Sequence, residues 1–163
     1  MRSASDVRKL TSAIPFWLTL LIPPLVGYSL FAGGWTVLIV PLYIWILMGV
    51  LDSVFGLDLK NANPDTPDSD LFWYRLVTLI WFPLQFIVVF GGIWILTSTT
   101  HLGFWESFAI LFGIGITSGT VGINYAHELM HQKSKIERWL ADLQMTMVLY
   151  GHFRSEHLLV HHL

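Results

Sequence analysis

Residues 71–96 read LFWYRLVTLIWFPLQFIVVFGGIWIL, and Arg75 is the only charged side chain among them. A helix needs ~20 consecutive, mostly apolar residues to cross the hydrocarbon core of a bilayer. The stretch exceeds that length, so it predicts a transmembrane helix from about Leu71 to Leu96. A chain with one such segment is a candidate membrane protein.

Three further stretches are also long and apolar enough to span a membrane, at about residues 14–31, 35–51 and 107–125. The whole chain is 54% hydrophobic and 12% charged, whereas a soluble domain carries roughly 25% charged residues. The first stretch follows three basic residues as a signal peptide would, but it is a membrane thickness long, so we interpret it as a retained span. The sequence therefore predicts an all-α, polytopic transmembrane helix bundle of about four spans, with residues 1–163 in one domain.

The nine Lys and Arg residues are distributed unevenly along the chain. With four spans, the short loops at residues 32–34 and 97–106 lie on one side of the membrane, and neither contains Lys or Arg. Cytoplasmic loops carry an excess of Lys and Arg. We therefore expect the N-terminus, the 52–70 loop and everything after residue 125 to be cytoplasmic.

Two segments outside this pattern carry further predictions. Gly115 and Gly119 form a GxxxG pattern that favours close helix packing, although a plain glycine-rich helix would read the same way. Residues 133–150 are too short and too polar to span the membrane. They predict an amphipathic helix on the cytoplasmic or interfacial side, with an apolar face formed by Ile136, Leu140, Leu143, Met147 and Tyr150.

Five of the seven histidines fall in two short clusters, HELMH at 127–131 and EHLLVHH at 156–162. Residues four apart share one helix face, so each cluster offers a pair of imidazoles to one ion. Neutral imidazole suits iron, zinc, copper and nickel, and the chain has no cysteine that could compete as a ligand. We predict a metal site formed by His127, His131, His157, His161 and His162.

Other polar residues near the clusters are expected to lie around the metal ligands or away from them. We expect Glu128 and Glu156 to orient the histidines from outside the coordination shell, the alternative being solvated carboxylates at helix ends. His152 is a further candidate for this outer position. His101 is expected to be a loop residue on the opposite side of the membrane. The net charge of −2 gives no basic footprint for nucleic acid binding.

The first cluster also matches HExxH, the motif of zinc metalloproteases, in which Glu128 would be the general base. Such a site takes one further ligand and an open position for water, whereas the second cluster offers three more imidazoles. A metal transporter is a non-enzymatic alternative, but it would need ionisable residues near mid-membrane. None is obvious in the four predicted spans.

At the two clusters the sequence resembles the integral-membrane alkane hydroxylases. The first box reads NYAHELMHQK at 124–133, and the second follows YGHF at 150–153 and reads EHLLVHH at 156–162. Asp52, Gly56, Asp58, Asn63-Pro64 and Tyr74-Arg75 extend the resemblance upstream. Met130 stands where a small glycine is common, and Gln132 intervenes before Lys133. The spacing of the second box favours a hydroxylase over a desaturase.

The resemblance implies a membrane-bound non-haem di-iron monooxygenase in a bacterial inner membrane. It would hydroxylate the terminal carbon of n-alkanes with O2 and electrons from a rubredoxin-type donor. A related hydroxylase or desaturase acting on an alkyl-aromatic or fatty acyl substrate is the alternative within the superfamily. The family has a third histidine box and further spans, so we expect this chain, with its His-box region at 124–163, to be the N-terminal part of a longer protein that completes the iron site.

Overall fold

The computed structural model describes residues 12–55 and 71–157, and in this part of the chain every regular element is a helix. Four helices are long and apolar enough to cross a membrane: Ser12–Ala32, Gly34–Leu51, Phe72–Ser98 and Phe104–Met130. The prediction of an all-α bundle with about four spans is confirmed. The upstream residues of the resemblance between 56 and 64 lie outside the described residues.

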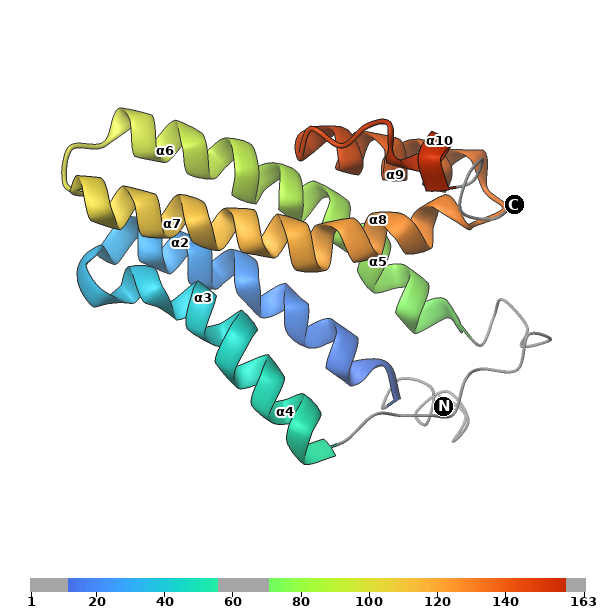
Figure 1. Cartoon of the computed structure of the whole chain (residues 1–163), viewed down its shortest axis with the longest axis horizontal. Coiled ribbons are helices and arrows are strands. Elements are labelled where there is room, and N and C mark those ends of the chain that lie inside the picture. The colour runs from blue at the N-terminus through green and yellow to red at the C-terminus, as the bar shows by residue number, and fades with distance from the viewer. Residues whose placement is uncertain (1–11, 56–70, 158–163) are drawn as a thin grey trace, which may run out of the picture.

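Consecutive long helices run antiparallel to each other along the length of the molecule (Figure 1). The first ends in α2 (Ile22–Ala32), and the second contains α3 (Ile39–Leu42) and α4 (Met48–Phe55). The third consists of α5 (Phe72–Phe86), a π turn and α6 (Gly92–Ser98). The fourth consists of α7 (Phe104–Thr117), a π turn at Ser118–Gly122 and α8 (Ile123–Met130).

Two short connections close one end of the bundle, where α2 meets the second helix and α6 meets α7 (Figure 1). Gly33 and Gly34 adopt φ of 62° and 58°, a left-handed conformation that glycine enters without steric cost. The Glu106 carboxylate accepts hydrogen bonds from the backbone N–H groups of Gly34 (2.5 Å) and Gly103 (2.6 Å). The first and last pairs of helices are thereby tied together at this end.

The apolar core runs through the middle of the bundle and contains side chains from all four long helices. Its fully buried members include Ile22, Val40, Trp81 and Ile114. Large apolar side chains also point outward, as a lipid-facing surface requires: Trp35, Trp94 and Trp105 are exposed near the closed end. Tryptophan is enriched at membrane interfaces, which fits the position of these three rings.

The fourth helix is longer than the predicted span of 107–125. It begins at Phe104, where the Glu106 side chain caps the first turn at Gly103, and it continues to Met130. The first histidine box is therefore the last two turns of the membrane helix rather than a separate segment. No polar break separates the box from the rest of the span, because Asn124 and Tyr125 lie within the helix.

The predicted packing role of Gly115 and Gly119 is not seen among the described residues. A Cβ atom at either position would meet no atom within 4 Å. Gly113 and Gly122 are the closely packed glycines of this helix: a Cβ at Gly113 would lie 3.4 Å from Val40, and a Cβ at Gly122 would lie 2.2 Å from the Gln85 Oε1. The helices approach one another along a different face from the one that the pattern suggested.

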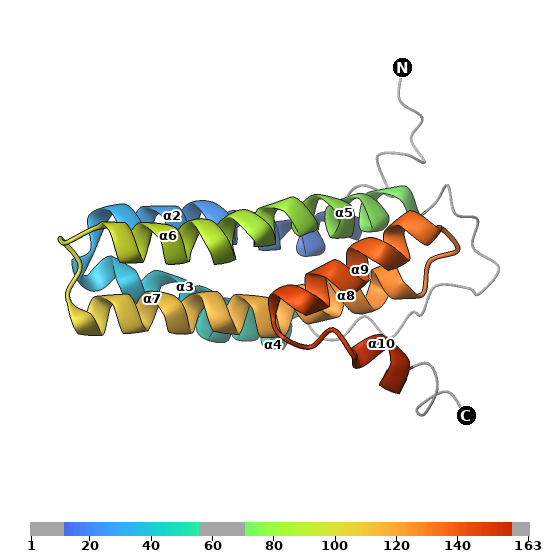
Figure 2. The same cartoon turned by 90° about the horizontal axis from the view of Figure 1, so that it is seen from above.

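After the bundle, α9 (Lys135–Met147) turns back and packs along α8 and α5 (Figure 2). The amphipathic helix was predicted, but the residues that it buries against the bundle are not those of the predicted apolar face. Ile136 is 70% exposed, and the buried positions are Glu137, Ala141, Gln144 and Met145. Two of these are polar, and each has a partner in the bundle: Glu137 accepts two hydrogen bonds from Arg75 (2.5 Å each), and Gln144 donates to the Gly122 carbonyl (2.7 Å).

Candidate metal centre

The end of the fourth helix presents His127 and His131 on one face, one turn apart, as their spacing predicts. Tyr125 fixes the rotation of this helix end. Its buried hydroxyl donates to the Phe16 carbonyl (2.8 Å), its oxygen lies 2.9 Å from the Thr19 Oγ1, and its ring packs edge-on against Trp81. These contacts tie α8 to the first and third helices only two residues before His127. The face on which the two imidazoles lie is thus set by the bundle.

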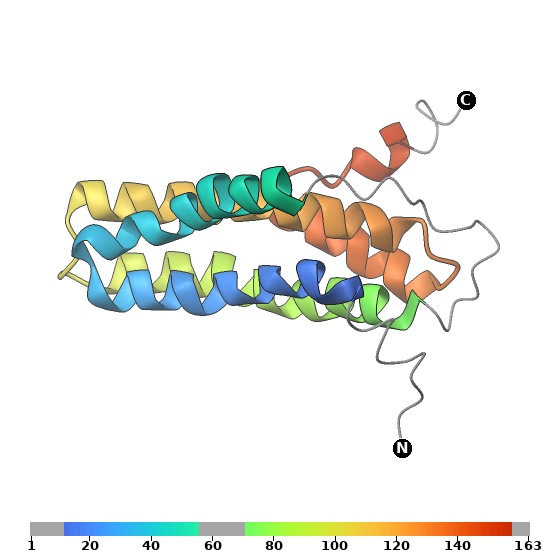
Figure 3. The ribbon, with the colours of Figure 1, turned by 90° about the horizontal axis from the view of Figure 1, so that it is seen from below.

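The third imidazole arrives from a different part of the chain. Beyond α9, the chain makes a sharp turn into the short helix α10 (Phe153–Glu156), at whose end His157 lies. The turn is a left-handed helix ending: Leu149 has φ of 60°, and the Tyr150 N–H donates to the Met145 carbonyl (2.9 Å). This reversal carries α10 back beside α8, as seen from the opposite side in Figure 3.

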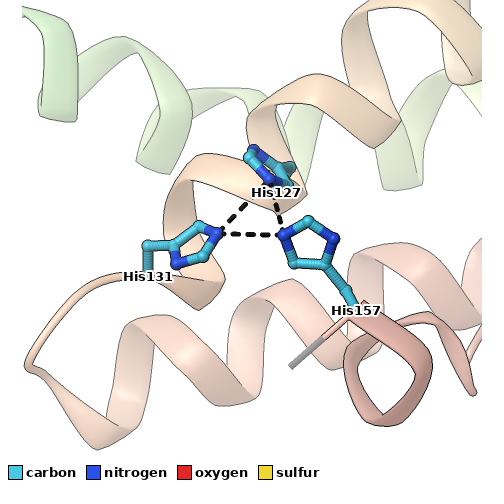
Figure 4. Close-up of side chains that lie close together, drawn as sticks. All are labelled: His127, His131 and His157. Carbon is cyan, nitrogen blue, oxygen red and sulfur yellow. Dashed lines mark hydrogen bonds between the residues drawn. The ribbon is translucent and has the colours of Figure 1, made fainter. Parts of the chain in front are cut away.

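Three ring nitrogens converge where these elements meet (Figure 4). The Nε2 atoms of His127 and His157 lie 3.0 Å apart, those of His131 and His157 3.2 Å apart, and those of His127 and His131 3.3 Å apart. His127 and His157 are half-buried, whereas His131 is exposed. Three of the five predicted ligands lie among the described residues, and these three form one triangle of imidazoles.

This triangle has the dimensions of a metal-binding set. Metal–imidazole bonds of ~2.0–2.1 Å, at angles between about 90° and 110°, place neighbouring ligand nitrogens ~2.8–3.4 Å apart. All three observed separations fall in that interval. Three neutral imidazoles facing one another through Nε2 would also oppose lone pair to lone pair unless an ion or protons lay between them. The residues present therefore fit a bound metal ion.

Glu128 and Glu156, the carboxylates predicted to orient the histidines, lie beside different kinds of residue: Glu128 beside a member of the triangle and Glu156 beside a histidine outside it. The Glu128 Oε1 lies 3.5 Å from the Nδ1 of His127, on the side of the ring away from the triangle, which is the position that orients a ligand ring. The Glu156 Oε1 lies 3.6 Å from the Nε2 of His152. Glu156 and His152, which were both expected to surround the ligands, therefore lie beside each other.

Two predicted ligands, His161 and His162, lie outside the described residues. His101 lies at the closed end of the bundle, where its ring contacts Thr99 and its Nε2 lies 3.1 Å from the Leu30 carbonyl oxygen. It is thus a loop residue at the end of the molecule opposite the triangle, as expected.

Sequence patterns did not single out two residues that shape the centre. The Phe153 ring stacks on the imidazole of His157, with ring centres 5.2 Å apart and an angle of 15° between planes. Arg138 donates to the carbonyls of Gln132 (2.8 Å) and Lys133 (2.7 Å) and so braces the turn that follows His131. Phe153 ends the YGHF stretch that precedes the second box, which was the one available signal. Arg138 looked like one member of a charged run.

No protein-family model matches the chain, but several curated proteins are similar to it. Alkane 1-monooxygenase 1 of Alcanivorax borkumensis is 31% identical over 145 residues, which are 85% of this chain and 35% of the relative. The alkane 1-monooxygenase of Pseudomonas putida is 29% identical over 83% of this chain and 33% of its own length. That of Ectopseudomonas oleovorans is 30% identical over the same shares.

The chain is a homologue of the alkane 1-monooxygenases. It spans about a third of the length of these relatives. The resemblance inferred from the two histidine boxes is therefore confirmed, and it extends over most of the chain, spans included. The imidazole triangle of an alkane 1-monooxygenase homologue is accordingly a candidate catalytic metal centre.

Proposed function

We propose that this chain supplies part of the metal site of a membrane monooxygenase that hydroxylates the terminal carbon of n-alkanes. The observation that carries the proposal is the convergence of three imidazole nitrogens at the end of a membrane helix bundle, in a homologue of the alkane 1-monooxygenases. O2 would be the oxidant, and a rubredoxin-type protein would be the electron donor. The two latter assignments rest on the resemblance.

The metal that we propose for this centre is iron, as the resemblance implies. Imidazole ligands suit several transition metals, but zinc has no redox chemistry, and a monooxygenase must pass electrons to dioxygen. Iron bound here would supply dioxygen activation. His127, His131 and His157 would hold one ion of a di-iron centre, and we propose that His161 and His162 contribute to the same centre.

The chain's own residues would bind the substrate, orient it and exclude water. A cavity of about 180 Å³ opens between the first, second and fourth helices, and Phe16, Met48 and Val121 form part of its lining. Asn124, also in the lining, lies one turn before His127 on the same helix face. An apolar opening between membrane helices, with a lining that reaches Asn124, suits a hydrocarbon dissolved in lipid.

Two other functions are less well supported. In a zinc protease, Glu128 would face the metal-bound water, but its carboxylate lies beside the far nitrogen of His127. A transporter would need ionisable groups deep in the membrane, whereas Arg75 and Glu106 lie near the ends of their helices. A fatty acyl or alkyl-aromatic substrate remains the alternative within the same chemistry.

The experiment that tests the proposed function is oxygen incorporation by membranes that contain the full-length protein. Supplied with an n-alkane, a reductant and isotopically labelled dioxygen, these membranes should produce a 1-alkanol carrying one labelled oxygen. Membranes with His127→Ala should produce none, because the triangle then loses a corner. Peptide cleavage without alkanol formation would overturn the proposal in favour of a protease.

A further inference from the structure

His157 differs from the other two imidazoles in how it is held. His127 and His131 belong to a long membrane helix, whereas His157 ends the four-residue helix α10. A helix of one turn has almost no stability of its own, because the first turn fixes several residues for a single hydrogen bond. The position of His157 therefore depends on contacts that α10 makes with its surroundings.

The strongest polar contact of α10 is the ion pair between Arg154 and Asp142. The Nη1 of Arg154 lies 2.6 Å from the Asp142 Oδ2, and both side chains are partly exposed, at 41% and 35%. Arg154 lies three residues before His157, so the two side chains project from one side of the turn. Fixing the guanidinium on α9 fixes the rotation of α10 about its axis and hence the direction of the imidazole.

Asp142 is a firm attachment point because α9 is anchored along its length. Glu137 is paired with Arg75, Gln144 is bonded to the Gly122 carbonyl, and Ala141 is fully buried. Phe153, the residue next to Arg154, packs against the buried cluster that contains Ala141, and its ring stacks on the imidazole of His157. Contacts thus run without a break from the bundle through α9 and α10 to the third imidazole.

We propose that the Asp142–Arg154 ion pair is a positioning device that completes the imidazole triangle, resting on the metal site proposed above. Neither Asp142 nor Arg154 belongs to the imidazole triangle, so the pair acts through the placement of His157. A partly exposed ion pair contributes little to folding. Its removal should therefore loosen metal binding while the helix bundle stays intact.

The test is Co2+ binding to the purified full-length protein in detergent, monitored by the visible absorption of the bound ion. Arg154→Ala and Asp142→Asn should each weaken Co2+ affinity by ~10–100-fold, the usual loss for residues that orient ligands. The double variant should bind no worse than either single variant, since residues that act as one unit are not additive. Circular dichroism and the melting temperature should stay close to those of the unaltered chain.

The signs of these effects separate positioning from simple electrostatics. If charge alone mattered, losing the Arg154 cation would tighten Co2+ binding, losing Asp142 would weaken it, and the double variant would be unchanged. Lys133→Ala, which removes an exposed cation from the turn after His131, should leave the affinity within about twofold, a small change on the scale of screened surface charges.

Two results would overturn different parts of the account. Equal or tighter Co2+ binding by Arg154→Ala would end the positioning proposal and leave the metal site standing. An unaltered chain that binds no Co2+ would end the metal site and, with it, the positioning of His157. If Arg154→Ala fails to fold, Arg154→Gln carries the test, because it removes the cation while preserving most of the side-chain length, and weaker Co2+ binding would again be opposite in sign to the purely electrostatic effect.

Discussion

At the scale of single residues, the i, i+4 spacing was enough to predict that His127 and His131 face one ion, because residues four apart share one face in any α-helix. The clustering of the histidines predicted that His157 joins them, but spacing alone could not give its distance in space, which depends on the turn at Leu149. The pairing of Glu156 with His152 could not be predicted. A carboxylate beside two histidines has several possible partners, and the helix rotation chooses among them.

Leu149 is the residue whose backbone conflicts most clearly with its type. Its φ of 60° places a bulky residue in the left-handed region, which costs roughly 1–2 kcal/mol. Its side chain is 91% exposed, so little burial is lost on truncation. Leu149→Gly should raise the free energy of unfolding by about 1 kcal/mol, measured by thermal or denaturant unfolding in detergent. Leu149→Val is the matched control and should be destabilising; stabilisation by both would contradict the left-handed turn.

His152 tests the boundary between ligands and their surroundings. Its ring lies beside Glu156 and Tyr150 and outside the triangle. In the full-length protein, His152→Ala should therefore retain most of the iron while alkane hydroxylation falls ~10–100-fold, as for other residues around a ligand shell. Elemental analysis and the rate of alkanol formation, taken on one preparation, would check this. Iron loss as complete as in His131→Ala would make His152 a ligand.

At the scale of helices, the four spans were predictable because bilayer thickness fixes how many apolar residues a span needs. The buried face of α9 was not, because periodicity counts apolar residues and this helix buries Glu137 and Gln144. Each has a hydrogen-bond partner far away in the sequence that lowers the cost of its burial. Arg75 donates to Glu137, and Gln144 donates to the Gly122 carbonyl. The π turn at Ser118–Gly122, which sets the rotation of α8, likewise has no sequence signal of its own.

Gly122 and Gly119 form a matched pair for testing the packing of the fourth helix. A Cβ at Gly122 would lie 2.2 Å from the Oε1 of the buried Gln85, an atom that already accepts from the Trp81 indole (2.8 Å). Gly122→Ala should therefore lower the free energy of unfolding by about 1–3 kcal/mol, the usual cost of overpacking.

Gly119→Ala serves as the control, because its Cβ would meet nothing within 4 Å. It should be neutral or stabilising by up to about 1 kcal/mol, since alanine favours the helix over glycine. Unfolding of both variants in detergent, compared with the unaltered chain, would measure the difference. Destabilisation by Gly119→Ala equal to that by Gly122→Ala would show that the sequence-based packing face was right after all.

At the scale of the whole molecule, charge divides the two ends of the bundle. The Lys and Arg residues among the described part of the chain lie at the end that carries the imidazole triangle: Arg75, Lys133, Lys135, Arg138 and Arg154. The turns at the closed end contain none. The positive-inside rule predicts a cytoplasmic metal centre, where a soluble electron donor could reach it.

Because the chain has no cysteine, single cysteines can test this orientation without background labelling. Thr100→Cys, at the closed end, should react with a membrane-impermeant maleimide added to intact cells. Lys133→Cys, in the turn after His131, should react only after the cells are opened. Both positions are exposed in the structure, so neither should resist labelling for steric reasons. Labelling of Lys133→Cys from outside would reverse the topology.

We propose that His127, His131 and His157 together hold iron, and this is tested by the metal content of the full-length protein and its alanine variants. The unaltered protein should contain iron. His127→Ala, His131→Ala and His157→Ala should each lose most of it, because the remaining two nitrogens no longer enclose the ion. His101→Ala, whose ring bonds to the Leu30 carbonyl at the far end of the bundle, should keep its full iron content. Zinc without iron in the active protein, or iron loss in His101→Ala as complete as in His131→Ala, would contradict the account.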